Sequence, residues 1–143
     1  MIRYHWQLDV YKLSVEAGMA IFAETKQYPR EEMYSLTDQI RRSSRSVSGQ
    51  IAEGWRKRKY EAAFVSKLND AEGEAAETQS WIEYSVRCKY LALAKGRQLH
   101  RLYDRIIGKL VKMGNNPGTF LLDKTAKPSS AKPTPPLPRS LTL

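Results

Sequence analysis

The sequence predicts an all-α protein: an antiparallel up-down four-helix bundle followed by a disordered, proline-rich C-terminal tail. Four stretches repeat apolar residues at three- and four-residue spacing, the pattern of a helix with one buried face. No stretch alternates apolar and polar residues with a period of two, so strands are not expected. The apolar stripes are suited to helices that pack at shallow angles in a bundle.

The four stripes define the face of each helix that we expect to point inward. The first stripe consists of Leu8, Tyr11, Val15, Met19 and Phe22. The second consists of Met33, Leu36, Ile40, Ser44, Val47, Ile51 and Trp55. The third consists of Tyr60, Phe64, Leu68, Ala71, Ala75, Thr78, Ile82 and Val86. The fourth consists of Leu99, Leu102, Ile106, Leu110 and Met113.

Proline and glycine mark the expected ends of these helices. Pro29 suits the first turn of the second helix, and the acidic Glu31 and Glu32 suit its positive N-terminal end. Gly96 and Gly114 bound the fourth helix. The turn sequence GNNPG at 114–118 ends the apolar periodicity. We therefore expect one bundle domain at 1–114 and a basic, flexible tail at 115–143, from which Phe120, Leu121 and Leu122 can dock back.

The composition limits the class of protein. The chain of 143 residues has 24 Lys and Arg against 15 Asp and Glu, a net charge of +9 that favours anionic partners. The single cysteine, Cys88, excludes an internal disulfide and suits a reducing compartment. No signal peptide or membrane span is apparent, so a cytoplasmic protein without membrane contact is expected.

Charge is segregated along the chain. Residues 41–59 contain seven Lys or Arg and one Glu, whereas residues 61–83 contain one Lys and six acids. Residues 87–112 contain eight Lys or Arg and one Asp. Such asymmetry serves either contacts between helices or subunits, or binding of an external anion.

The basic residues of the second and fourth helices are the candidate nucleic-acid contacts. On the second helix Arg41, Arg45 and Arg56 form a stripe with the small residues Gly49 and Ala52, so another backbone or a phosphate chain can approach closely. The full candidate set is Arg41, Arg42, Arg45, Arg56, Lys57, Arg58, Lys59, Arg101, Arg105, Lys109 and Lys112. The alternative is a solvated face or a subunit contact for the second helix, and a solvated outer face for the fourth.

The turn between the second and third helices holds four consecutive basic residues, 56–59, between Trp55 and Tyr60. Base stacking beside phosphate contacts would use this arrangement. Because both aromatics lie on apolar stripes, the sequence favours core positions for them. Lys57 follows Glu53 by one turn, the favourable order for an ion pair within a helix.

Motifs of catalysis and of metal or cofactor binding are missing from the sequence. His5 and His100 have no partners at metal-ligand spacing, and the Glu-x-x-His pairs of di-iron bundles do not occur. Phosphate-binding glycine loops and nucleophile elbows do not occur either. We expect neither an enzyme nor a cofactor.

The segment YPREEMYSLTDQIRRSSRSVSGQIAEG, residues 28–54, resembles a known family. It is similar to the bacterial four-helix-bundle proteins encoded in intervening sequences of 23S ribosomal RNA genes. This family includes relatives of the accessory variability protein of diversity-generating retroelements. The resemblance rests on Tyr28, Pro29, Glu32, Leu36, Gln39, Ile40, Arg41, Arg42, Ser46, Val47, Ile51, Ala52, Glu53 and Gly54.

Similarity in helical layout extends over residues 8–113, and the motif is closer to the intervening-sequence branch. Ser48 replaces a usual proline, which favours a straighter second helix, and Gln50 replaces a usual asparagine. The resemblance implies a ring-like homopentamer with no known enzymatic activity. For the retroelement relatives it also implies binding to nucleic acid and to a reverse transcriptase.

Two functions follow from these patterns. The first is a non-catalytic homo-oligomer whose basic surfaces bind RNA or DNA, as an accessory to a reverse transcriptase or a ribonucleoprotein. The second is a protein–protein scaffold, in which arginine stripes meet the acidic third helix of a neighbouring subunit.

Overall fold

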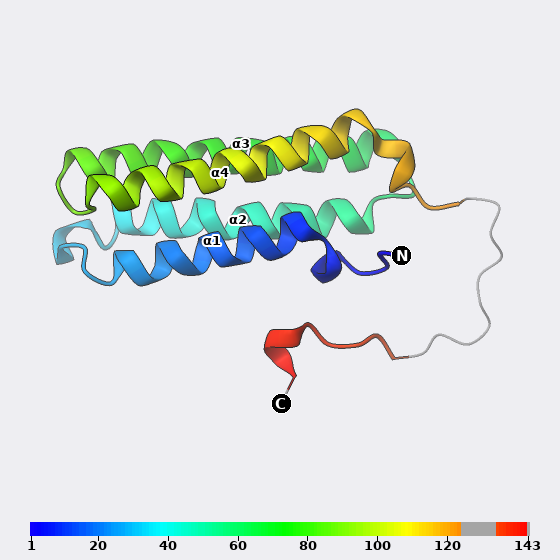
Figure 1. Cartoon of the computed structure of the whole chain (residues 1–143), viewed down its shortest axis with the longest axis horizontal. Helices are drawn as coiled ribbons and strands as arrows, with labels where there is room; N and C mark the ends of the chain where they lie inside the picture. The colour runs from blue at the N-terminus through cyan, green and yellow to red at the C-terminus, as the bar shows by residue number, and fades with distance from the viewer. Residues whose placement is uncertain (124–133, 143) are drawn as a thin grey trace.

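A computed structural model of the chain describes residues 1–123 and 134–142 and contains four long helices (Figure 1). They are α1 (Asp9–Thr25), α2 (Leu36–Arg56), α3 (Glu61–Arg87) and α4 (Leu93–Asn115). Short 3₁₀ helices are η1 (His5–Gln7), η2 (Arg30–Glu32), η3 (Pro117–Thr119) and η4 (Arg139–Leu141). No strand occurs in the described residues, so the all-α four-helix prediction is confirmed.

The helices lie side by side, and successive helices run in opposite directions (Figure 1). α1 packs against α2 and α4, and α3 packs against the same two helices. α1 and α3 therefore occupy opposite corners of the bundle. This arrangement decides which charged helix faces are neighbours.

The predicted inward faces of α2, α3 and α4 are largely confirmed. Their buried apolar residues form one cluster that runs through the bundle; the members from these helices are Ile40, Val47, Ile51, Trp55, Phe64, Leu68, Ala71, Ala75, Ile82, Leu99, Tyr103, Ile106, Leu110 and Met113. α2 continues unbroken through Ser48, whose hydroxyl donates to the Arg45 carbonyl. The buried Tyr103 is an addition to the predicted stripe of α4.

The predicted inward face of α1 is right only at its start, where Leu8 is buried and Tyr11 packs against the core, and it is wrong further along the helix. The structure buries the positions Val10, Ser14, Ala17, Ile21 and Thr25. The predicted stripe members Val15 and Met19 are instead 39% and 59% exposed. The stripe was misplaced because two buried positions are polar: the hydroxyls of Ser14 and Thr25 donate to carbonyls of their own helix, which removes much of the cost of burial.

Three helix starts also differ from the prediction. α4 begins before Gly96, so Gly96 lies inside this helix and does not bound it. Pro29 precedes the short helix η2, and α2 begins only at Leu36, so Met33 lies outside α2 and is exposed. Tyr60 precedes the first turn of α3 and is 59% exposed rather than buried. Met33 and Tyr60 each lie beside a helix end, where the helical period no longer fixes the direction of the side chain.

The chain packs on the bundle beyond the end of α4. The ring centre of Phe120 lies 6.3 Å from that of Trp55 and 6.3 Å from that of Phe64. The predicted disorder of the tail concerns residues that include 124–133 and 143, which lie outside the described part of the chain.

Candidate nucleic-acid interface

Arg41, Arg45 and Arg56 form a row on the side of α2 that faces α1, here called the α2 row. The Arg41 Nε donates a 2.9 Å hydrogen bond to the Thr25 hydroxyl of α1. The guanidinium carbons of Arg41 and Arg45 lie 5.0 and 5.8 Å from the ring centre of Phe22. At the other end, the charge of Arg56 adds to partial burial in lowering the pKa of His5.

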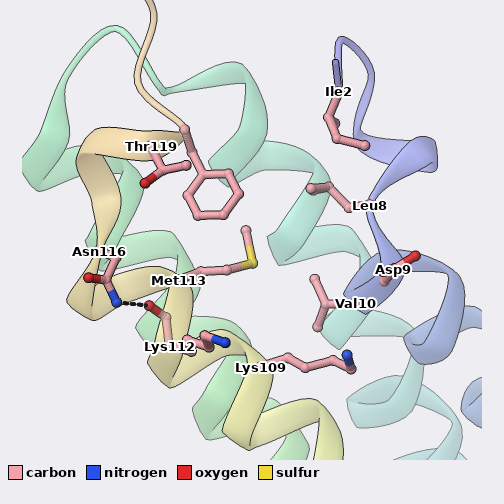
Figure 2. Close-up of a pocket in the computed structure, with 10 residues that line it drawn as sticks. Ile2, Leu8, Asp9, Val10, Lys109, Lys112, Met113, Asn116 and Thr119 are labelled. Atoms are coloured by element: carbon pink, nitrogen blue, oxygen red, sulfur yellow. Dashed lines mark hydrogen bonds between the residues drawn. The ribbon is translucent and has the colours of Figure 1, made fainter.

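The candidate basic residues of α4, here called the α4 row, are Arg101, Arg105, Lys109 and Lys112. Lys109 and Lys112 line a pocket of about 630 Å³ together with Leu8, Asp9 and Val10 from the start of α1. Figure 2 shows their side chains beside α1, and the Asn116 amide bonded to the Lys112 carbonyl. Lys109 and Lys112 therefore lie on the side of α4 that faces α1. Arg101 and Arg105 are exposed.

Arg42 lies on a different side of α2. Burial raises the pKa of Glu74 on α3, and the nearby Arg42 charge opposes this rise. Since Arg42 approaches the acidic helix, it is separate from Arg41 and Arg45 although it is their neighbour in sequence.

The four basic residues of the α2–α3 turn have different environments. Arg56, Lys57 and Lys59 are exposed, and the Lys59 ammonium lies 5.7 Å from the ring centre of Tyr60. Arg58 is half-buried and packs over the Trp55 ring at 3.6 Å. Partial burial, with a smaller contribution from Arg56, lowers the pKa of Arg58.

Arg58 contributes to the packing of the chain on itself. Its Nε donates to the Trp55 carbonyl at 2.7 Å, and its Nη1 donates to the Phe120 carbonyl at 3.4 Å. Its own carbonyl accepts a bond from the Leu122 amide. Arg58 thus ties the residues after α4 to the α2–α3 turn, and only its remaining edge faces solvent.

None of the eleven predicted basic residues lies within 4.0 Å of an acidic side chain in the described residues. The ion pairs there use other cations: Lys67 with Glu53 and Asp70, Arg87 with Glu83, and Lys95 with Glu24. The His100 Nδ1 lies 3.6 Å from the Asp104 carboxylate. The strongest contact joins the Glu53 carboxylate to Lys67 on α3 at 2.8 Å. The predicted pairing of Glu53 with Lys57 is reduced to a weaker attraction that also lowers the pKa of Glu53.

The bundle is basic around α1 and acidic at the opposite corner, around α3. The α2 and α4 rows flank α1 on its two sides, whereas α3, at the opposite corner, carries Glu61, Asp70, Glu72, Glu74, Glu77 and Glu83. A polyanion would be attracted to the α1 side and repelled by the α3 corner.

Sequence reasoning missed two residues beside the α2 row, Phe22 and Lys26. The Lys26 ammonium lies 4.8 Å from the ring centre of Phe22. Their spacing of four residues at the end of α1 was the available signal. It was missed because Phe22 was assigned to the core.

Neither a metal site nor a membrane-spanning helix is found among the described residues. No three His, Cys, Asp or Glu side chains come together there in a way that could hold a metal ion. None of the described helices has the length and apolar character needed to cross a membrane.

Comparison with known proteins places the fold in a family. Residues 6–112 match the model of the 23S rRNA-intervening sequence protein family. The chain belongs to this family. A crystal structure of an S23 ribosomal protein family member of unknown function from Bacteroides thetaiotaomicron is similar, with 26% sequence identity and a TM-score of 0.67. The match covers 74% of this chain and 95% of that chain. No curated protein matches the sequence.

Two residues of the family motif have clear structural roles in this member of the family. Glu53 makes the ion pair with Lys67 described above. Gly54 is buried where α2 crosses α3, and a Cβ there would lie 3.1 Å from the Lys67 Cβ. These motif residues hold α2 against α3, whereas Arg41 of the motif belongs to the α2 row.

Proposed function

We propose that this protein is a non-catalytic, homo-oligomeric module that binds RNA or DNA along the α2 and α4 rows on either side of α1. The observation that carries the proposal is that these basic side chains have no acidic partner within 4.0 Å in the described residues. Like charges left unpaired on one side of a small domain repel each other. A polyanion relieves this repulsion and releases its own counterions.

The family supports this function. The family name refers to intervening sequences of 23S rRNA. The proposal places the protein in the cytoplasm, where nucleic acid is accessible. The resemblance to the accessory variability protein adds two parts to the proposal. The homo-oligomer is a pentamer, and a reverse transcriptase is a protein partner.

Exposed apolar side chains on α1 support the homo-oligomer. Val15 and Met19 lie on the outer side of α1, between the two basic rows in the fold. Contact between copies would remove this surface from water, and repetition of a modest basic surface raises avidity without new contacts. The alternative is a scaffold in which the α2 row of one copy meets the acidic α3 of the next.

Charge reversal combined with a measurement of oligomeric state separates the two functions. Binding of a labelled RNA and a labelled DNA is followed by fluorescence anisotropy, and mass is followed by light scattering. For nucleic-acid binding we expect Arg41→Glu/Arg45→Glu to retain the oligomer and lose affinity, and the affinity of the native protein to fall steeply with salt. For the scaffold we expect the same variant to lose the oligomer.

A matched control is available at the C-terminal end of α3. Arg87→Glu/Lys89→Glu makes the same change in net charge at exposed positions outside both rows. This variant should bind the labelled RNA and DNA nearly as well as the native protein does. Absence of binding to any RNA or DNA at about 50 mM salt would refute nucleic-acid binding.

A further inference from the structure

Three cations from two helices surround one aromatic ring at the end of α1. The Lys26 ammonium and the guanidinium carbons of Arg41 and Arg45 lie 4.8, 5.0 and 5.8 Å from the ring centre of Phe22. Lys26 directly follows α1, and the two arginines are one turn apart on α2. None of the three has an acidic side chain within 4.0 Å in the described residues.

Arg41 is held in a defined orientation. Its Nε donates to the Thr25 hydroxyl at 2.9 Å, and that hydroxyl donates to the Phe22 carbonyl at 3.0 Å. Thr25 is buried, with 3% of its surface exposed, so this bonded chain is fixed by the core. Within the described residues only Nε of Arg41 makes a hydrogen bond, so the two terminal nitrogens remain available to a ligand. An arginine that is already ordered loses less entropy when it binds.

The cluster is better suited to an anion than to solvent alone. The aromatic ring attracts each cation, but it does not neutralise any of them. Lys26 also benefits from its place at the negative end of α1, which keeps it near the ring. A phosphate group accepts a paired bond from an arginine fork and a further bond from a lysine, so one phosphate can engage all three.

We propose that Lys26, Arg41 and Arg45 form a binding site for a backbone phosphate of the bound nucleic acid, and that Phe22 positions the three cations. The inference rests on the proposed function and adds to it a defined contact. It also assigns a role to two residues, Phe22 and Lys26, outside the predicted basic set. An acidic peptide segment is the other chemistry that such a cluster could accept.

The test compares two lysines of the α1 region. Lys26→Gln removes one cation of the cluster, and Lys12→Gln removes an exposed cation of α1 that is not in it. Affinity for a labelled single-stranded RNA is measured by fluorescence anisotropy over a range of salt concentrations. We expect Lys26→Gln to reduce the slope of log affinity against log salt by about one, and Lys12→Gln to leave it unchanged.

Phe22→Leu tests the positioning role. It keeps an apolar side chain but removes the ring, so the three charges remain while their arrangement loosens. We expect the affinity to fall about threefold with the salt slope retained. Circular dichroism and thermal unfolding verify that each variant is folded.

The outcomes separate the site from the function on which it rests. If the native protein binds RNA and Lys26→Gln has the same slope and affinity as Lys12→Gln, the site is refuted and the proposed function stands. If the native protein binds no nucleic acid, both are refuted. Displacement of the RNA by an acidic peptide with equal dependence on Lys26 would assign the cluster to a protein partner and refute the phosphate site.

Discussion

The hydroxyl of Tyr90 donates a 3.0 Å hydrogen bond to the Glu32 carboxylate and thereby joins the two connections at one end of the bundle. Glu32 ends η2, between α1 and α2, and Tyr90 follows α3. The Tyr90 ring also lies 5.5 Å from that of Tyr28, centre to centre. Tyr28 and Glu32 belong to the family motif, so part of that motif secures the loops rather than binding a ligand.

The Glu32–Tyr90 bond makes stability depend on pH at both extremes. Hydrogen bonds from Ser35 and Tyr90 lower the pKa of Glu32, so its contribution is present above pH 4.5 and lost as pH falls through the folded pKa. The bond to Glu32 raises the pKa of Tyr90 to about 12 from 10.0. The contribution of Tyr90 is therefore full below pH 10.0 and lost as pH rises towards about 12.

Tyr90→Phe tests this coupling by urea unfolding at several pH values. The variant should be less stable than the native protein at neutral pH. The difference in unfolding free energy should shrink as pH rises above 10.0, because only the native protein has this phenol to ionise. A difference that stays constant up to about pH 12 would show that the bond does not form in solution.

The sequence predicted the fold through its large apolar residues. Ile40, Ile51, Phe64 and Leu110 repeat with the helical period, and all of them are buried. It failed on α1, where the inner face uses Ser14, Ala17 and Thr25. Small and polar residues can occupy a core when they bond to their own helix, and apolar counting does not recognise them.

The candidate interface was predicted only in part, for a related reason. Spacing along one helix located the α2 and α4 rows, because neighbours on a helix face are set by local geometry. The contacts that decide the role of a basic residue come from elsewhere in the chain. Arg58 is held by Phe120, 62 residues away, and Lys26 joins Arg41 only because α1 and α2 pack together.

The close approach of α3 and α4 depends on Gly96. A Cβ at this position would overlap the Val86 Cγ2, and a β-branched side chain has little freedom to turn away. Gly96→Ala should lower the free energy of unfolding by about 1–3 kcal/mol. On the same helix, nothing lies within 4 Å of a Cβ at Gly108, so Gly108→Ala should raise it by up to about 1 kcal/mol. Urea unfolding measures the change in unfolding free energy for both variants. If both changes had the same sign, the close packing at Gly96 would be contradicted.

Lys89, two residues after the end of α3, adopts the left-handed backbone conformation, with φ of 65°. The Tyr90 amide donates to the Ser85 carbonyl and the Lys89 amide donates to the Val86 carbonyl, the bonding pattern in which glycine is preferred. Lys89→Gly should raise the free energy of unfolding by about 1 kcal/mol. Lys89→Ala keeps a Cβ and should change it by less than about 0.5 kcal/mol. Similar gains for both would mean that the backbone at this residue is not strained.

A buried polar contact links α2 to α3 at the middle of the bundle. The Thr78 hydroxyl donates to that of Ser43 at 2.8 Å, and both side chains are buried. Thr78→Val and Ser43→Ala should each lower the free energy of unfolding by about 1–3 kcal/mol, because each leaves a buried hydroxyl or carbonyl with fewer hydrogen-bond partners. The double variant should lose less unfolding free energy than the two single variants together, as expected for directly bonded groups. Additive costs in chemical unfolding would indicate that the two hydroxyls act independently.

Phe120 extends the packed unit beyond α4, and its ring meets both Trp55 and Phe64. Phe120→Ala removes this partly buried ring and loosens the segment whose carbonyl bonds Arg58. We expect a loss of about 1–3 kcal/mol in the free energy of unfolding. Leu122→Ala is the control, since Leu122 is exposed and should change stability by less than about 0.5 kcal/mol. Tryptophan fluorescence, to which Trp6 and Trp81 contribute as well as Trp55, follows the urea unfolding of both variants. Equal stability of Phe120→Ala and the native protein would place the end of the packed unit at α4.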